Sequence, residues 1–171
     1  MDDVIVAPSR IHGLGMFAAR DFAAGERILR RNHVREVTPG APIREDLGER
    51  DYHCDDLSGG RVVLLGWPDR HFNHCCDPSA YVREIDGVRY IYARRNTATG
   101  EEITNDYCMN GIGDTVWECA CGSEQCRRTI HSDFFHLPLE KQIEYLPLLM
   151  DWFIDERREP IEALRKRAAL R

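Results

Sequence analysis

The sequence lacks any apolar run long enough to cross a membrane, and its first residues carry no cluster of basic side chains. A membrane helix needs about 18 or more consecutive apolar residues, and a secretory signal begins with a positively charged region. The N-terminal Met1-Asp2-Asp3 has neither property. We therefore expect a protein that is not secreted, makes no use of a membrane, and works in the cytoplasm, or in the nucleus if the cell has one.

An excess of positive charge is also missing. Lys and Arg total 23 against 29 Asp and Glu, which gives a net charge of -6, and only Lys141 and Lys166 are lysines. Proteins that hold nucleic acid through bulk electrostatics present a basic face, so we expect no direct nucleic-acid binding. Negative charge suits a basic protein or peptide substrate, although solubility alone explains it equally well.

Internal repeats and low-complexity tracts are absent as well. The chain has 171 residues, of which 43% are hydrophobic and 30% charged. These values are typical of a folded globular protein and exclude extensive disorder. The length suits one domain, with room for an appendage.

Seven cysteines make an odd number, and without an export signal a disulfide framework is not expected. Cys119, Cys121 and Cys126 are grouped on a short glycine-containing segment. Three thiolates at this spacing supply three corners of a tetrahedral zinc site, and the fourth ligand must come from elsewhere. Cys75 and Cys76 are both candidates for it. The alternative is three unrelated reduced cysteines.

Short apolar runs separated by turn residues predict a body made mainly of β-strands. We expect strands over residues 4–8 and 62–65, and Asp86-Gly87 between β-forming residues predicts a hairpin. Another strand is expected over residues 100–104, leading to Tyr107. The pattern between residues 32 and 69 is weak, and there we expect irregular structure with one short helix.

After Phe135 the apolar residues follow a helical spacing. Leu139, Ile143 and Leu146 predict a first helix, and Pro147 and Pro160 are placed where a second and a third helix would begin. We expect the apolar residues of these helices, Trp152 and Phe153 among them, to pack on the β body. A dimer surface is the alternative.

Two strings of residues carry most of the chemical information. Phe72-Asn73-His74-Cys75-Cys76-Asp77-Pro78 places an amide, an imidazole and two thiols side by side. Gly13-Leu14-Gly15-Met16-Phe17-Ala18 fits G-x-G-x-x-A, but a turn follows it instead of the helix that a dinucleotide fingerprint needs. The two glycines still allow the backbone to approach a ligand closely.

Four strings in this order resemble the SET-domain protein lysine methyltransferases. The family patterns are G-x-G-x-x-A, N-H-S-C-x-P-N, G-E-E-L-T-x-D-Y and a post-SET C-x-C-x4-C. The matching segments are residues 13–18, 73–79, 100–107 and 119–126. The resemblance covers roughly residues 4–130 and leaves the helical segment outside.

The resemblance implies a SET-domain, β-clip-like fold of short strands. In that fold the stretch holding Asn73 threads beneath the segment leading to Tyr107 in a knot-like manner. It also implies three parts: a SET domain over residues 1–112, a post-SET zinc segment over 113–130 and a C-terminal α-helical extension over 131–171.

The cofactor that the resemblance implies is S-adenosyl-L-methionine, together with one structural zinc ion. Trp117 is expected to cap the cofactor or the lysine channel, or else to be a core aromatic residue. The residues expected to contact S-adenosylmethionine are Gly13, Leu14, Gly15, Asn73, His74, Tyr107 and Trp117. The zinc ligands are expected to be Cys76, Cys119, Cys121 and Cys126, while Cys75 is a small buried side chain.

The implied reaction is methyl transfer to the ε-amine of a lysine in a protein substrate, with Tyr107 as the catalytic residue. Lysine has a pKa of about 10.4 in water, and burial beside a positive sulfonium lowers it. The alternative is a protein that is not an enzyme: a catalytically silent SET-like module, held together by zinc, that binds a partner protein. Histone and other protein substrates both fit the motifs.

Ser79 and Asn105 depart from the family pattern, and Asn105 replaces the usual aromatic residue that influences the number of methyl groups added.

Overall fold

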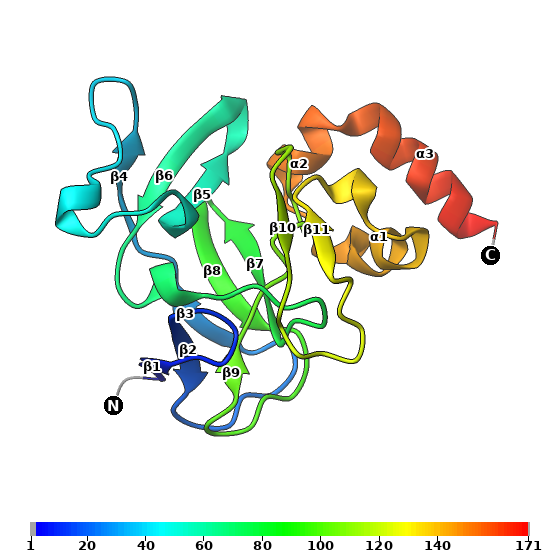
Figure 1. Cartoon of the computed structure of the whole chain (residues 1–171). Helices are drawn as coiled ribbons and strands as arrows, with labels where there is room; N and C mark the ends of the chain where they lie inside the picture. Colours follow the sequence, from blue (N-terminus) through cyan, green and yellow to red (C-terminus); the bar gives the residue numbers. More distant parts are fainter. Residues whose placement is uncertain (1–2, 171) are drawn as a thin grey trace.

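The computed structural model describes residues 3–170, and over this range the chain forms four small antiparallel sheets (Figure 1). The first consists of β1 (Val4–Pro8), β2 (Leu14–Ala18) and β9 (Glu102–Ile103). The second consists of β3 (Arg27–Arg30), β8 (Val88–Ala93) and β7 (Ala80–Ile85). The third consists of β4 (His33–Val37), β6 (Arg61–Leu65) and β5 (Cys54–Leu57), and the fourth of β10 (Val116–Glu118) and β11 (Thr129–His131). The mainly β fold is therefore confirmed.

The hairpin between β7 and β8 forms where the sequence predicts it. Asp86 and Gly87 have φ angles of 51° and 74° and connect two strands paired from Ala80 with Ala93 to Ile85 with Val88. Positive φ at both central residues is the type I′ geometry, whose twist matches that of the flanking strands. This turn fixes the register of the longest pair of strands.

The strand expected over residues 62–65 is confirmed by β6, but the prediction of irregular structure for the rest of the segment between residues 32 and 69 was wrong. This segment contains the whole β4–β6–β5 sheet and three 3₁₀ turns: η1 (Glu45–Leu47), η2 (Asp51–His53) and η3 (Ser58–Gly60). Another such turn, η4 (Asp69–His71), follows β6. Strands β4 and β5 carry no fully buried residue, so neither shows a regular apolar alternation. Their pairing with the buried strand β6 creates the sheet.

The C-terminal helices are present, but two of their boundaries differ from the prediction. After η5 (Phe134–His136) come α1 (Leu139–Tyr145), the 3₁₀ turn η6 (Leu146–Leu148), α2 (Asp151–Glu156) and α3 (Arg158–Ala169). Pro147 therefore lies in η6, and the second helix begins only at Asp151. Pro160 is the third residue of α3, where a missing N–H costs nothing because first-turn donors have no partner within the helix.

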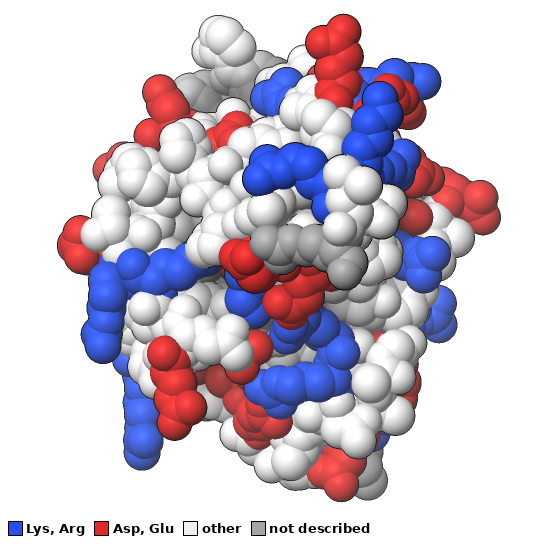
Figure 2. Space-filling model, turned by 90° about the vertical axis from the view of Figure 1, so that its right-hand side faces the viewer, with Lys and Arg blue, Asp and Glu red and all other residues white. Residues whose placement is uncertain are grey.

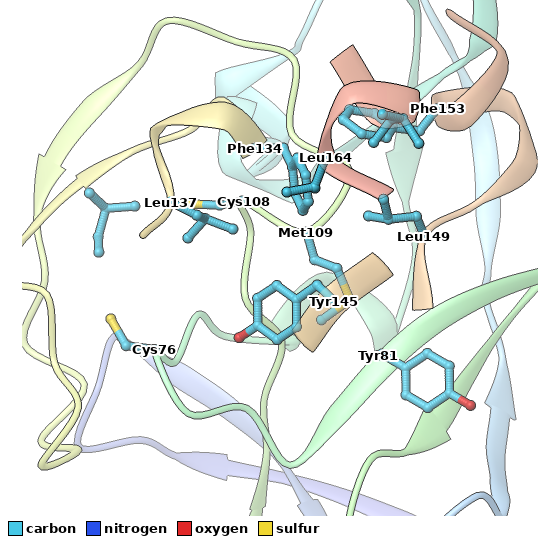
Figure 3. Close-up of a cluster of buried hydrophobic side chains, with 12 residues drawn as sticks. Cys76, Tyr81, Cys108, Met109, Phe134, Leu137, Tyr145, Leu149, Phe153 and Leu164 are labelled. Carbon is cyan, nitrogen blue, oxygen red and sulfur yellow. The ribbon is translucent and has the colours of Figure 1, made fainter. Parts of the chain in front are cut away.

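The helices pack against the β body and share a core with it (Figure 3). Phe153 of α2 and Leu164 of α3 are buried with Cys76 and Met109. Trp152 is half-buried beneath the Arg89 guanidinium of β8, whose carbon lies 5.6 Å from the ring centre. The expected packing of Trp152 and Phe153 is thus confirmed. Figure 2 shows acidic and basic side chains interspersed on the outer face of this side of the molecule.

The two strings richest in polar residues lie side by side. His74 and Asn105 form a parallel bridge, in which the Cys75 N–H donates to the Asn105 carbonyl at 2.8 Å. The Asn105 N–H donates in turn to the Asn73 carbonyl at 2.9 Å. Residues more than 30 positions apart are thereby held at one place, as the expected crossing of these segments requires.

Each helix within residues 3–170 is too short or too polar to cross a membrane. The expected cellular location stays a prediction, as does the division into parts ending at residues 112 and 130.

Candidate active site

A cavity of about 900 Å³ opens between the Gly13 loop, β5, the segment before Asn73 and β10. Six of the seven residues predicted to contact a cofactor line this cavity: Gly13, Leu14, Asn73, His74, Tyr107 and Trp117. Gly15 does not line it and lies behind the loop. The structure therefore gathers in one place residues that are distributed over more than 100 positions of the chain.

Asn73 holds the wall of the cavity together. Its Nδ2 donates to the carbonyls of His12 at 3.1 Å and Leu14 at 3.0 Å, and to Glu102 Oε1 at 2.8 Å. A Cβ atom added to Gly15 would fall 2.2 Å from the same Glu102 oxygen. Gly15 is therefore needed for close packing against Glu102, while Gly13, with a φ of 47°, supplies the turn. The sequence did not single out Glu102.

Tyr107 combines an accessible ring with a deeply placed hydroxyl. The residue as a whole is 40% exposed, because its ring faces the cavity. Its hydroxyl donates to the Phe72 carbonyl at 2.8 Å, and burial raises the pKa of the phenol. Tyr107 thus remains protonated at neutral pH and can present a hydroxyl at the end of the cavity.

His74 connects Tyr107 with a thiol group. The Tyr107 N–H donates to His74 Nδ1 at 3.1 Å, so the ring proton is on Nε2, which lies 3.5 Å from Cys76 Sγ. Burial lowers the pKa of His74 to about 4, which agrees with a neutral ring. The ring also lies edge-on to Tyr107 and Trp117, with centroids 5.4 and 5.5 Å away. Trp117 thus lines the cavity and at the same time packs against the core shared with the helices.

The four predicted metal ligands converge at one point. The Sγ atoms of Cys76, Cys119, Cys121 and Cys126 all lie within 4.8 Å of one another, and those of Cys76 and Cys119 are 3.9 Å apart. Tetrahedral Zn–S bonds of about 2.3 Å place sulfur atoms about 3.8 Å apart, so this set fits a zinc ion. Burial opposes ionisation of Cys121, but backbone N–H groups of Cys76 and Ser123 outweigh it and lower its pKa to about 7.

A buried ion pair that the sequence did not predict lies beside the cavity. Arg31 is 6% exposed and lines the cavity, its Nε lies 3.1 Å from the fully buried Asp69, and its Nη1 donates to Asp55 at 2.7 Å. Its charge lies close enough to Tyr107 to lower the pKa of the phenol, against the stronger effect of burial. No local pattern in the sequence indicates this ion pair, because Arg31 is 38 positions from Asp69 and 24 from Asp55.

Asn105, which replaces the family's aromatic residue, also lines the cavity. Its Oδ1 is buried and meets no hydrogen-bond donor from residues 3–170. The structure thus puts this departure from the family pattern next to Tyr107.

Comparisons with known proteins find similar sequences among histone-lysine methyltransferases. A 34% identical relative is "Histone-lysine N-methyltransferase trr" of Drosophila melanogaster, aligned over 141 residues that make up 74% of this chain and 6% of the relative. "Histone-lysine N-methyltransferase trithorax" of the same species is 29% identical over 140 residues, 76% of this chain and 4% of the relative. "Histone-lysine N-methyltransferase 2B" of Homo sapiens is 30% identical over 135 residues, 72% and 5% respectively. This chain thus spans about one twentieth of the length of these curated relatives.

A solved structure of a Plasmodium falciparum protein described as a histone methyltransferase is 21% identical, with a TM-score of 0.47. That similarity covers 63% of this chain and 94% of the other. The family model for the SET domain matches residues 13–108, more than half of the chain, and includes the Gly13 loop, Asn73, His74 and Tyr107. The chain therefore belongs to the SET domain family.

Proposed function

We propose that this protein transfers a methyl group from S-adenosylmethionine to the ε-amine of a lysine in a protein substrate. One observation carries the proposal: Tyr107, whose hydroxyl donates to the Phe72 carbonyl, lines the cavity around which the family's motif residues gather. Membership of the SET family and the lysine methyltransferase names of the relatives support the same activity.

The cofactor would occupy the part of the cavity between the Gly13 loop and Trp117. Backbone atoms of Gly13 and Leu14 would hold its amino-acid end, and the main chain of His74 would contact its adenine end. Asn73 would act partly through the loop, because its Nδ2 already binds the carbonyls of His12 and Leu14. Trp117 would cover the bound molecule with its aromatic ring.

S-adenosylmethionine, when bound, supplies a methyl group activated by a positive sulfonium. Tyr107 would hold the incoming lysine amine in line with that methyl group, and such positioning supplies a large part of the acceleration. The amine must be neutral to attack. Burial in the cavity and nearby positive charge both lower the pKa of the lysine, so none of the described side chains has to act as a general base.

The four thiols would hold one structural zinc ion, which would fasten the segment carrying Trp117 to Cys76. Because Cys76 follows Asn73 and His74 by only a few residues, the ion would fix β10 over the cavity. The donation of the Arg127 N–H to Cys76 Sγ at 3.4 Å favours a thiolate, and the burial of Cys76 suits a closed-site ligand and not a nucleophile.

The substrate class that fits best is a basic protein, because the chain carries a net charge of -6. Histones are one such class, and the relatives carry histone-lysine methyltransferase in their names. A basic protein of another kind would satisfy the same chemistry.

The test combines binding and transfer. We expect the protein to bind S-adenosylmethionine in a calorimetric titration and to transfer labelled methyl to one or more basic proteins or peptides. Tyr107→Phe should retain cofactor binding and lose transfer by about a hundredfold or more, because the orienting hydroxyl is gone. Tyr90→Phe, which changes a tyrosine of β8 outside the cavity, should leave both unchanged.

Absence of cofactor binding would contradict the enzyme assignment. Binding without transfer to any acceptor would instead favour a catalytically silent module.

A further inference from the structure

Asp106 is a fully buried carboxylate with hydrogen-bond donors from three separate parts of the chain. Its Oδ1 accepts from the Cys108 N–H at 3.1 Å and from Arg127 Nη2, in the segment after the thiol cluster, at 2.8 Å. Its Oδ2 accepts from the hydroxyl of Tyr145, in α1, at 3.1 Å.

Asp106 immediately precedes the residue proposed to be catalytic. The segment of Asn105, Asp106 and Tyr107 is held on one face by its backbone bonds to residues 73–75 and by the Tyr107 N–H bond to His74. On the other face it is held by the side chain of Asp106. The direction of the Tyr107 hydroxyl therefore depends on where the Asp106 carboxylate is fixed.

Tyr145 comes from a part of the molecule that the SET family match does not include, since that match ends at residue 108. Its ring is fully buried in the core shared by the helices and the β body. Figure 3 shows its hydroxyl pointing toward the side of Cys76, whereas that of Tyr81 points the opposite way. The helical extension thus reaches the site through one side chain.

Alternative donors for the Asp106 carboxylate lie close by. The Nε and Nη1 atoms of Arg127 are buried and find no acceptor among the described residues. A buried acceptor that loses its partner carries a desolvation penalty. Without the Tyr145 hydroxyl, the carboxylate would therefore turn toward Arg127 and pull the backbone before Tyr107 with it.

We propose that Tyr145 is a positioning residue of the active site, acting through Asp106 on the direction of the Tyr107 hydroxyl. The proposal rests on the function proposed above. The helical extension accordingly belongs to the catalytic unit and is more than a stabilising attachment.

Tyr145→Phe tests the proposal because it keeps the ring and removes only the hydroxyl. We expect kcat to fall about tenfold, because the Tyr107 hydroxyl would no longer be held in the productive direction. The peptide KM and the Kd of S-adenosylmethionine should stay within about twofold, and hydrogen exchange at the Tyr107 amide should become faster. Tyr81→Phe is the matched control: it lies in the same core, and no described residue bonds its hydroxyl. It should change none of these quantities.

Replacing Tyr145 by 4-aminophenylalanine restores a donor at the same place and should restore kcat. A Tyr145→Phe protein with unchanged kcat and unchanged exchange would overturn the proposal, as would a loss that 4-aminophenylalanine does not repair. If the unaltered protein transfers no methyl group at all, it is the proposed function that fails. Exchange at the Tyr107 amide then still tests the contact of Tyr145 with Asp106.

Discussion

Glu102 lies where the Gly13 loop, β9 and the Asn73 segment meet. Its carboxylate accepts from Ser9 Oγ at 2.9 Å and from Asn73 Nδ2 at 2.8 Å, and it occupies the space that a side chain at Gly15 would need. If the Glu102 carboxylate moves, its hydrogen-bond partners Ser9 and Asn73 must move with it or lose their bonds. At the scale of single residues, the cavity wall is therefore sensitive to the loss of the Gly15 hydrogen.

Gly15→Ala should displace Glu102 and release Asn73 from the Gly13 loop. We expect unfolding free energy to fall by about 1–3 kcal/mol, as for other overpacking substitutions. We also expect a loss of about tenfold in affinity for S-adenosylmethionine, measured by calorimetry. Gly40→Ala is the control, because the nearest atom to its added Cβ is 4.0 Å away. Equal affinities of the Gly15 and Gly40 variants would show that the wall does not depend on this contact.

The thiol cluster supports a second residue-scale prediction. The protein should contain one zinc ion per chain, and Cys76→Ser should lose it, because a closed structural site needs all four ligands. Elemental analysis after gel filtration measures the metal content. Cys75→Ser, which changes the neighbouring thiol, should keep the metal. Full zinc content in the Cys76 variant would assign the fourth ligand elsewhere.

At the scale of elements, the sequence predicted those parts whose structure depends on local signals. Asp86-Gly87 predicted the β7–β8 hairpin, and the spacing of Leu139 and Ile143 predicted α1. In the β4–β6–β5 sheet only the central strand β6 was expected, and β5 was missed because it reads Cys-Asp-Asp-Leu, which has little β propensity. What stabilises β5 is a tertiary contact: the Asp55 carboxylate accepts from Arg31 at the end of β3 and from Arg89 in β8.

The same distinction applies to the candidate site. Motif residues such as Asn73, His74 and Cys76 could be recognised in the sequence because each lies in a dense string of reactive side chains. The roles of Arg31, Glu102 and Tyr145 could not be recognised, because each depends on a partner that is distant in the sequence and is brought close only by folding. These partners are Asp69, Asn73 and Asp106 respectively.

The contacts of Asp55 make stability depend on pH. Burial raises the pKa of Asp55, but Arg31 and Arg89 outweigh it, so the pKa in the folded protein is below its ordinary value of 3.8. The folded state therefore binds fewer protons than the unfolded state. The stabilisation is present above about pH 4 and is lost as the pH falls through the lower pKa of the folded protein.

Comparison with Asp55→Asn isolates this contribution. At pH 7 the variant should be less stable by about 3 kcal/mol, because a buried ion pair is broken. Urea unfolding at decreasing pH should show this difference shrinking below about pH 4. A difference that stays constant down to pH 3 would mean that Asp55 has the same pKa in the folded and the unfolded protein.

At the scale of the whole molecule, the helices and the β body share one core. Phe134, Phe153 and Ile161 are fully buried beside Cys76 and Cys108, which flank the active site. A core that crosses the boundary between two parts couples their unfolding. We therefore expect the chain to unfold in a single cooperative step and not helix by helix.

Leu164→Ala in α3 tests this coupling. Removal of the side chain, which is 3% exposed, should lower the unfolding free energy by about 2–5 kcal/mol. Far-ultraviolet dichroism and tryptophan fluorescence should report the same shifted midpoint. Leu170→Ala, at an exposed position, should shift neither. Different unfolding midpoints for the two probes would indicate that α3 unfolds independently of the β body.

The central claim is that one cavity brings S-adenosylmethionine and a protein lysine together at the Tyr107 hydroxyl. The most direct measurement is the chemical identity of the labelled product: the protein is incubated with S-adenosylmethionine labelled in its methyl group and with basic acceptor proteins, and the acceptors are hydrolysed to amino acids. We expect label in methyllysine, and at least about a hundredfold less when Tyr107→Phe replaces the protein. Label in another amino acid, or equal labelling by the Tyr107 variant, would contradict it.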